Sequence, residues 1–344
     1  MSNNKLSLQL NVDDFLPASD EEKESLTVLR KSVGLWQDGI RRLKKNKIAM
    51  VSLVVIVFVF IFSFLVPQFY PYSYEQQIRG SENLAPMQYS EKELEAKAAG
   101  ESVFPHVLGT DNLGRDYAVR VMMGSRVSLT VGLVASAIIL LIGSLYGSVA
   151  GFFGGWVDMI MMRIVDMIYT VPDILIIVLL SVAFDQPLKA LAQKPGFEWI
   201  QVIGVNLISI FVVFALLYWV GMARIVRSQI LILKEQEYVT AARALGASNG
   251  RIIRKHLLTN CIGTLIVTTT LQIPSSIFTE SFLSFLGLGV AAPMPSLGSL
   301  ASAALNGLQS YPHRLFAPAL AISIIILSFN LLGDGLRSEE HTSE

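Results

Sequence analysis

The chain has 344 residues, of which 52% are hydrophobic and 16% are charged, and its mean hydropathy is positive. This composition excludes an ordinary soluble domain and indicates a polytopic membrane protein. The formal net charge is zero, and the single cysteine, Cys261, excludes an intrachain disulfide framework.

The N-terminal region, 1–47, is polar, and no cleavable signal peptide is expected before the first apolar run. From Leu26 to Leu43, apolar residues recur at intervals of three and four residues, with Trp36 among them and basic residues around them. This pattern predicts an amphipathic helix. A basic helix of this kind favours the inner membrane surface, and docking on a cytoplasmic partner is the alternative.

Six apolar runs are long enough to cross a bilayer. The first, Ile48 to Val66, ends at Pro67 and extends about 30 Å as a helix. Most runs lack the polar face of a soluble core helix. The sequence therefore predicts an all-α membrane protein with six transmembrane helices. The first is expected at 48–67 and the others at about 127–152, 164–184, 199–220, 261–283 and 314–336.

The distribution of Lys and Arg predicts the orientation. If the N-terminus is inside, the cytoplasmic segments are 1–47, 153–163, 221–260 and 337–344, and they contain 18 of the 27 Lys and Arg residues. Cytoplasmic segments of membrane proteins are enriched in these residues. We therefore expect a multi-pass protein of the inner or plasma membrane, with both termini cytoplasmic and 68–126 as a long external loop.

A polar segment between the fourth and fifth runs, Glu237 to Gly246, resembles the EAA loop of ABC-transporter permeases. Further motifs accompany it in the family's order, at Leu108–Asp116, Arg120–Leu129, Gly151–Gly155, Glu280–Gly289 and Gly333–Arg337. Together they resemble the second ("C" type) permease of oligopeptide and dipeptide importers, in the binding-protein-dependent transport family, which also includes nickel permeases. The resemblance covers residues 35–337.

The resemblance implies a type I ABC importer permease fold. Its permease core is expected at 127–337, with five transmembrane helices and a coupling loop at 221–260 that carries a cytoplasmic coupling (EAA) helix. The chain is expected to form half of a pore in the lipid bilayer. The implied partners are a homologous second permease, two ATP-binding cassette ATPase subunits, an external substrate-binding protein and a peptide substrate, with no nucleic acid.

ATP and Mg are expected on the ATPase partners, so this chain is expected to be a transport subunit and not an enzyme. It has no Gly-Lys dipeptide and therefore no Walker A loop. No catalytic residue, bound cofactor or metal is expected in it. The tail, 338–344, departs from the family pattern after Arg337 and is set apart as atypical.

The resemblance assigns ATPase coupling to one short stretch. Its residues are Glu237, Tyr238, Thr240, Ala241, Ala242, Arg243, Leu245 and Gly246. Good helix formers followed by Gly246 predict a short helix that ends at the glycine. Thr240 stands where the family commonly has Glu, and Thr259 where it commonly has Pro.

Three residues of the fifth run are candidates for the translocation pathway or a gate: Glu280, Gln272 and Ser276. A carboxylate at membrane depth is costly unless it is paired or hydrated, so Glu280 is either a pathway residue or a structural group. Polar side chains in this run suit a path for a peptide backbone, but they also bond to their own helix.

Two other features leave alternatives open. Gly143, Gly147 and Gly151 form a small-residue stripe that permits close helix approach, within the subunit or, less favoured, to the second permease. Asp158, Arg163 and Asp166, near the inner end of the third run, are expected to fix the geometry between helices.

Oligopeptides are the favoured substrate, with dipeptides or nickel as the alternatives within the family. The spans contain no Cys and His cluster suited to nickel. An ion channel would need a repeated filter. An intramembrane protease would need a histidine at membrane depth, but all four histidines lie outside the predicted spans. They are His106, His256, His313 and His341.

Overall fold

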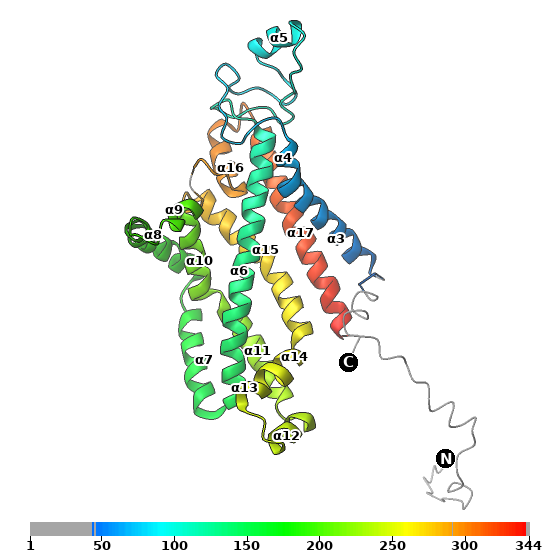
Figure 1. Ribbon diagram of the computed structural model, residues 1–344, viewed down its shortest axis with the longest axis vertical. Helices are drawn as coiled ribbons and strands as arrows, with labels where there is room; N and C mark the ends of the chain where they lie inside the picture. Colours follow the sequence, from blue (N-terminus) through cyan, green and yellow to red (C-terminus); the bar gives the residue numbers. More distant parts are fainter. Residues whose placement is uncertain (1–42, 45, 291, 342–344) are drawn as a thin grey trace, which may run out of the picture. The chain divides into compact units, whose positions relative to one another are not determined.

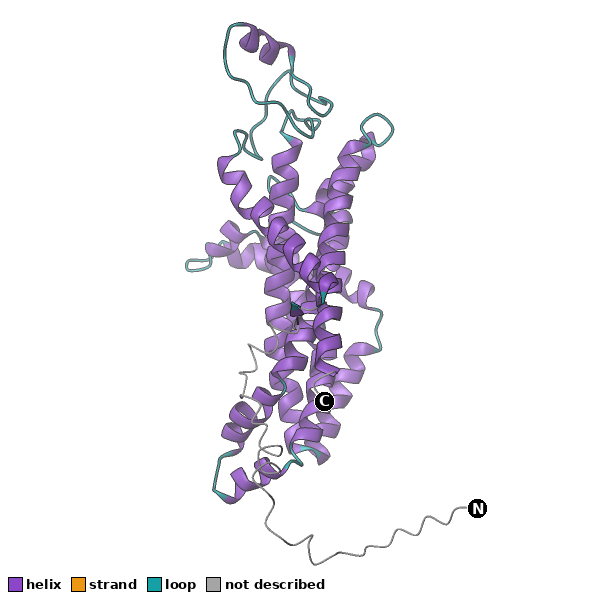
Figure 2. Ribbon diagram, turned by 90° about the vertical axis from the view of Figure 1, so that its right-hand side faces the viewer, coloured by secondary structure: helices purple, strands orange, loops and turns teal. Residues whose placement is uncertain are grey.

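The structure is a computed structural model that describes residues 43, 44, 46–290 and 292–341. Its contacts divide the chain into two units, Met1–Lys45 and Asn46–Glu344. The predicted amphipathic helix lies, except for Leu43, outside the described residues. All elements below belong to the second unit, whose described residues form helices and loops without a β-strand (Figure 2).

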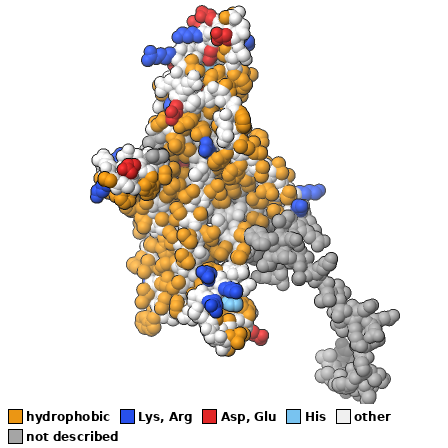
Figure 3. Space-filling model, viewed as in Figure 1, with side chains coloured by type: hydrophobic (Ala, Val, Ile, Leu, Met, Phe, Trp, Pro, Cys, Tyr) orange, Lys and Arg blue, Asp and Glu red, His pale blue; other side chains and the backbone are white. Residues whose placement is uncertain are grey.

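Six helical stretches are long and apolar enough to cross a membrane. They are Lys47–Phe69, Tyr117–Phe153, Ile174–Ala192, Val205–Leu233, Ile262–Phe285 and His313–Ser338. Figure 3 shows apolar side chains over the middle of the unit, with most charged side chains towards its two ends. The prediction of an all-α membrane protein with six transmembrane helices is confirmed.

The first span combines α3 (Lys47–Phe60), a π-helical segment (Ile61–Leu65) and α4 (Val66–Phe69). It begins at Asn46, whose side-chain oxygen accepts hydrogen bonds from the first backbone N–H groups of the helix. The span lies beside α17 (His313–His341), as Figure 1 shows.

The longest helix, α6 (Tyr117–Phe153), runs through the unit from the end that carries α5 (Glu91–Ala98) to the end that carries α12 (Glu237–Ala244) (Figure 1). We call these the α5 end and the α12 end. Against α6 pack α10 (Val205–Leu217), α11 (Trp219–Leu233) and α15 (Ile262–Phe285). The core of the unit therefore forms around one continuous helix.

The small-residue stripe of α6 packs against α11, within the subunit. A Cβ on Gly147 would lie 2.3 Å from the carbonyl oxygen of Ala223, and one on Gly143 would lie 2.6 Å from the Cβ of Met222. These distances leave no room for a side chain. The favoured alternative, packing inside the subunit, is thus the observed one.

We expect Gly147→Ala to destabilise the purified subunit by about 1–3 kcal/mol, because the added methyl group forces α6 and α11 apart. Thermal unfolding in detergent measures the effect. The matched control is Gly221→Ala in α11, where an added Cβ meets no atom within 4 Å. Alanine there reduces the flexibility of a helical glycine, so a gain of about 0.5–1 kcal/mol is expected. Equal effects of the two substitutions would contradict this packing.

The third span differs from the prediction. The helix α7 (Gly155–Tyr169) ends before Pro172, and α8 (Asp173–Ala192) begins after it, so the apolar helix lies at Ile174–Ala192 and not at 164–184. Proline has no backbone N–H and disfavours helical conformation in the residue before it. The break at Pro172 therefore divides one apolar run between two helices.

The fourth span also extends further than predicted. A short helix, α9 (Trp199–Ile203), precedes α10, and α11 continues to Leu233 and not only to residue 220. Two of the basic side chains that favoured a loop after residue 220 form ion pairs with α7. Arg227 bonds to both carboxylate oxygens of Asp158, each at 2.5 Å, and Arg224 contacts Asp166 at 2.8 Å. Both acidic partners lie on α7.

After α15 the chain forms a short helix, α16 (Leu297–Ala304), and a 3-10 turn (Leu305–Gly307) before α17. The helix α16 packs against α15, α17 and α6. A Cβ on Gly298 would lie 2.0 Å from the carbonyl oxygen of Ser281, so α16 and α15 touch through their backbones.

The loop region between the first two spans is held together by a buried histidine. His106 has no exposed surface, and its Nδ1 and Nε2 lie 2.7 Å from Asp116 and 3.0 Å from Glu93. Each carboxylate also caps a helix. Asp116 accepts from the N–H of Val119 in α6, and Glu93 from the N–H of Ser90 at the start of α5. His106 thus joins the beginnings of two helices.

Burial lowers the pKa of His106, but its hydrogen bonds to Asp116 and Glu93 together raise it more, so the pKa lies above the ordinary value of 6.5. The bridge therefore stabilises the folded state fully below the unfolded pKa of about 6.5. The stabilisation is lost as pH rises through the raised folded pKa, because neutral imidazole can donate to only one of its two carboxylates.

We expect limited proteolysis of the loop between α5 and α6 to accelerate as pH rises above about 6.5. The control is His106→Gln, whose side chain does not titrate, so its cleavage rate, corrected for the protease's own pH profile, stays constant over this range. Slower cleavage of the wild-type chain at higher pH would contradict the bridge.

Candidate functional site

The predicted coupling segment forms a helix whose end follows from its sequence. The helix α12 runs from Glu237 to Ala244, and Gly246 follows with a φ of +79°. The N–H of Ala247 donates to the carbonyl of Ala242 at 3.0 Å, and that of Gly246 to Arg243 at 2.9 Å. Glycine favours this left-handed C-terminal turn. The predicted helix that stops at Gly246 is confirmed.

One face of α12 is fixed to the rest of the subunit. Val239 and Ala242 are 0% and 9% exposed, and they belong to the apolar cluster that also contains Phe152 of α6. The guanidinium of Arg243 lies over the Phe152 ring, 5.3 Å from its centre. From α14 (Leu258–Asn260), the side-chain amide of Asn260 donates to the Tyr238 hydroxyl. These contacts hold α12 against the α12 end of the bundle.

The other face of α12 is uncovered. The exposed residues of α12 and its end are Glu237, Tyr238, Thr240, Ala241, Arg243 and Leu245; of these, Tyr238 and Arg243 also make the contacts described above. Leu245 is 89% exposed and Tyr238 is 38% exposed. The structure thus brings together most of the residues expected to couple to an ATPase, but Ala242 faces the core and Gly246 shapes the turn. A water-exposed leucine at the end of a short, firmly held helix suits a surface that a partner covers.

The base of this surface is anchored by polar contacts. Asp158 and Asp166 form the ion pairs between α7 and α11 that are described above. The sequence predicted that these two residues and Arg163 fix the geometry between helices. Arg163, however, is exposed. Lys234 adds a contact that the sequence did not indicate, because its ammonium donates to the carbonyl of Gly151 at 3.0 Å. This lysine follows α11 directly, so it ties the start of the segment to α6.

Behind α12, the chain returns to the membrane through α13 (Asn249–Arg251), a π-helical segment (Ile252–Leu257) and α14 (Leu258–Asn260). Ile252 and Leu257 are fully buried in the same cluster as Ala242. The segment 249–260 therefore packs into the same apolar cluster as the buried face of α12.

The three pathway candidates have different surroundings. Glu280 has no exposed surface and accepts hydrogen bonds from the hydroxyls of Ser128 and Ser284, both at 2.7 Å, and of Ser281 at 3.3 Å. Ser276 is fully buried, whereas Gln272 is half-buried. Only Gln272 therefore keeps a surface that a substrate could reach in this conformation, and the pathway role of all three stays a prediction.

Two known protein families match parts of this chain. Residues 143–338 match the family of binding-protein-dependent transport system inner membrane components. Residues 34–86 match the N-terminal transmembrane domain of oligopeptide transport permease C.

Individual relatives match almost end to end. The chain is 40% identical to an oligopeptide transport system permease protein of Bacillus subtilis, over 94% of each chain. It is 41% identical to a dipeptide transport system permease protein of the same organism, over 94% of this chain and 90% of the relative. An oligopeptide permease protein of Escherichia coli is 36% identical over 88% of this chain and 89% of the relative. The chain belongs to the family of binding-protein-dependent transport system inner membrane components.

Proposed function

We propose that this chain is a permease subunit of an ATP-driven peptide importer, with oligopeptides as its substrate. The observation that carries the proposal is α12, a helix with one face packed into the membrane unit and the other uncovered. The relatives are transport permease proteins and not enzymes, and an oligopeptide permease protein is 40% identical along nearly its whole length. A dipeptide substrate is the second candidate, because a dipeptide permease protein is 41% identical.

We propose that the subunit forms half of a pore with a homologous permease. Two ATPase subunits, which hold ATP and Mg, would bind at the α12 end, and an external binding protein would deliver the peptide at the α5 end. This orientation makes the α12 end cytoplasmic. The Lys and Arg residues of 221–260 support it, because cytoplasmic segments are enriched in these residues.

In the proposed mechanism, ATP binding draws the two ATPase subunits together and displaces α12. The contacts of α12 with Phe152, and of Lys234 with the carbonyl of Gly151, pass this movement to α6. The Arg227–Asp158 pair carries α7 along. The membrane helices then move as packed bodies between two states that the nucleotide favours differently.

Uptake of labelled peptides by cells with and without this gene tests the proposal. Loss of tetra- and pentapeptide uptake upon deletion, restored by the gene, is the expected result. Loss of dipeptide uptake alone would replace the substrate and keep the permease assignment. Unchanged uptake of all peptides would contradict a peptide importer.

A further inference from the structure

The fifth span, α15, is the least apolar of the six, and its polar side chains divide between two faces. Glu280 bonds to α6, and Ser276 beside it is fully buried. On the other face, Thr268 and Gln272 are half-buried and Ser275 is exposed. The span therefore has one polar face that the subunit covers and one that it leaves open.

The open face carries a single row of polar side chains. Thr268, Gln272 and Ser275 follow each other at intervals of four and three residues, which places them on one side of a helix. Thr279 continues the row, and its hydroxyl lies 3.1 Å from the Tyr218 hydroxyl at the end of α10. From 268 to 279 this polar row extends about 16 Å along the helix axis. That length is about half the thickness of the hydrocarbon core of a bilayer.

Three members of the polar row leave their hydrogen-bonding groups unused. Within the described residues, the side chains of Thr268, Gln272 and Ser275 have no hydrogen-bond partner. Each hydroxyl can donate one bond, and the carboxamide of Gln272 can donate two and accept two. The polar row therefore needs surroundings that donate and accept hydrogen bonds.

Hydroxyls on other exposed parts of the spans behave differently. Thr130 in α6, Thr270 in α15 and Ser323 in α17 each donate to the carbonyl four residues earlier, all at 2.8 Å. A serine or threonine on a helix can satisfy its hydroxyl in this way without any outside partner, which suits contact with lipid. Thr268 and Ser275 do not form this bond, so their surface does not have the arrangement that lipid favours.

The depth of Gln272 gives the strongest argument. It is the eleventh of the 24 residues of α15, about 15 Å from the start of the helix and about 20 Å from its end. Its side chain is too short to reach the headgroups on either side from there. An unpaired carboxamide is costly in hydrocarbon. Water satisfies donors and acceptors in any arrangement, whereas a second helix would need a matching row of polar groups.

We propose that the polar row of α15 lines a water-filled path by which a hydrophilic solute crosses the membrane. The inference rests on the proposed function as a permease subunit and assigns the wall of the path to one helix face. The hydroxyls and the carboxamide keep this wall hydrated, so the solute does not have to lose its water to hydrocarbon. Ser276, on the buried face, does not line the path.

Labelling of engineered cysteines in membranes that contain the assembled complex tests the path. The probe is Ser275→Cys, and the matched control is Ser276→Cys, the same substitution at the adjacent, fully buried position. A second control is Val57→Cys, which is 50% exposed near the middle of the apolar first span. The wild-type chain gives the background, since its one cysteine, Cys261, is 2% exposed.

We expect a charged, membrane-impermeant thiosulfonate to label Ser275→Cys about tenfold faster than either control, because the reactive thiolate forms in water and not in apolar surroundings. Gln272→Cys is expected to react as fast as Ser275→Cys. Rates are measured with and without ATP, because a transporter opens to one side at a time.

Two results would overturn the path. Labelling of Ser275→Cys as slow as that of Val57→Cys in both nucleotide states would show that the polar row faces lipid. Fast labelling in the isolated subunit that is lost in the complex, with and without ATP, would show that the second permease covers the polar row.

A second measurement tests whether transport uses the path. Gln272→Leu is expected to lower peptide uptake about three- to tenfold without lowering the thermal stability of the subunit, because an apolar wall disfavours water in a narrow path. Gln272→Asn keeps the carboxamide and is expected to retain most of the uptake. Equal uptake by the Leu variant and the wild type would contradict the path.

The two measurements separate this inference from the proposed function. If the wild-type chain imports no peptide but Ser275→Cys still reacts fast, the peptide substrate is wrong and the water-filled path stands. Normal peptide uptake together with slow labelling of Ser275→Cys and Gln272→Cys refutes the path alone.

Discussion

We expect Leu245→Glu to abolish peptide uptake while the subunit remains folded and inserted. Leu245 is 89% exposed in the subunit, so the substitution removes no packing within it. In the complex, a partner that covers α12 would bury a new charge in place of an apolar anchor. Central anchors of interfaces contribute about 2 kcal/mol or more, and an unpaired buried charge adds a further cost. Uptake, co-purification of the ATPase subunits and the amount of inserted subunit are the measurements.

A leucine at the opposite end of the molecule provides the control. Leu94 in α5 is 51% exposed, and Leu94→Glu is expected to leave ATPase co-purification unchanged. Ala242→Arg would be a poorer test, because Ala242 packs against the subunit's own core and its substitution would disturb α12 itself. Normal uptake and normal ATPase binding by Leu245→Glu would exclude α12 as the docking surface.

We expect Glu280→Ala to destabilise the subunit by about 2–5 kcal/mol. The change leaves a cavity and deprives three serine hydroxyls of their acceptor, on two helices, α6 and α15. Glu280→Gln is expected to cost much less. The amide keeps one acceptor oxygen, and a serine hydroxyl can rotate to accept from its nitrogen. Thermal unfolding of the purified subunit measures both effects.

Comparison of uptake with stability for Glu280→Gln separates the two roles open to this residue. If uptake and stability both remain near wild type, Glu280 is a structural acceptor. If the variant is stable but does not transport, Glu280 acts in the pathway, as one interpretation of the sequence holds. An Ala variant as stable as the wild type would contradict the hydrogen-bond cluster.

The elements that depend on local sequence were predictable. Apolar run length predicted six membrane helices, and Gly246 predicted the end of α12, because a helix terminus depends on a few neighbouring residues. The break of the third apolar run at Pro172 could also have been predicted from the proline, but the length of the run alone does not indicate it. The two faces of α12 were not distinguishable, since small residues such as Ala241 and Ala242 occur on both.

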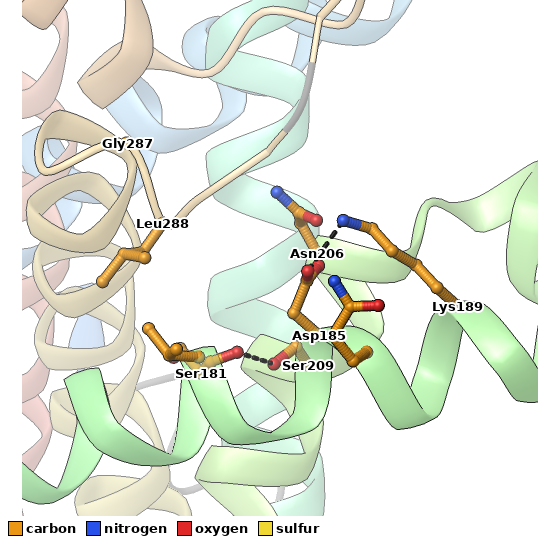
Figure 4. A pocket seen from close by; sticks show the side chains of 9 residues that line it. Ser181, Asp185, Lys189, Asn206, Ser209, Gly287 and Leu288 are labelled. Atoms are coloured by element: carbon orange, nitrogen blue, oxygen red, sulfur yellow. Dashed lines mark hydrogen bonds and ion pairs between the residues drawn. The ribbon is translucent and has the colours of Figure 1, made fainter.

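Contacts between distant residues could not be predicted in the same way. Ser128 and Glu280 are 152 residues apart, and Arg227 and Asp158 are 69 apart, so no periodic pattern relates the partners. The sequence marked Glu280 and Asp158 as notable charges but could not give their partners. A hollow of about 350 Å³, lined by Ser181, Asn206 and Leu288 among others (Figure 4), could not be predicted for a similar reason, because α8, α10 and the loop after α15 each supply only part of its wall.

The length of α6 has a mechanical consequence. Its 37 residues contain no proline, so one unbroken rod of about 55 Å joins the His106 bridge to the cluster under α12. Tilting such a rod by about 5° shifts one end relative to the other by about 5 Å. A small angular displacement at the α12 end therefore becomes a movement of atomic size at the α5 end, and no helix has to unfold between them.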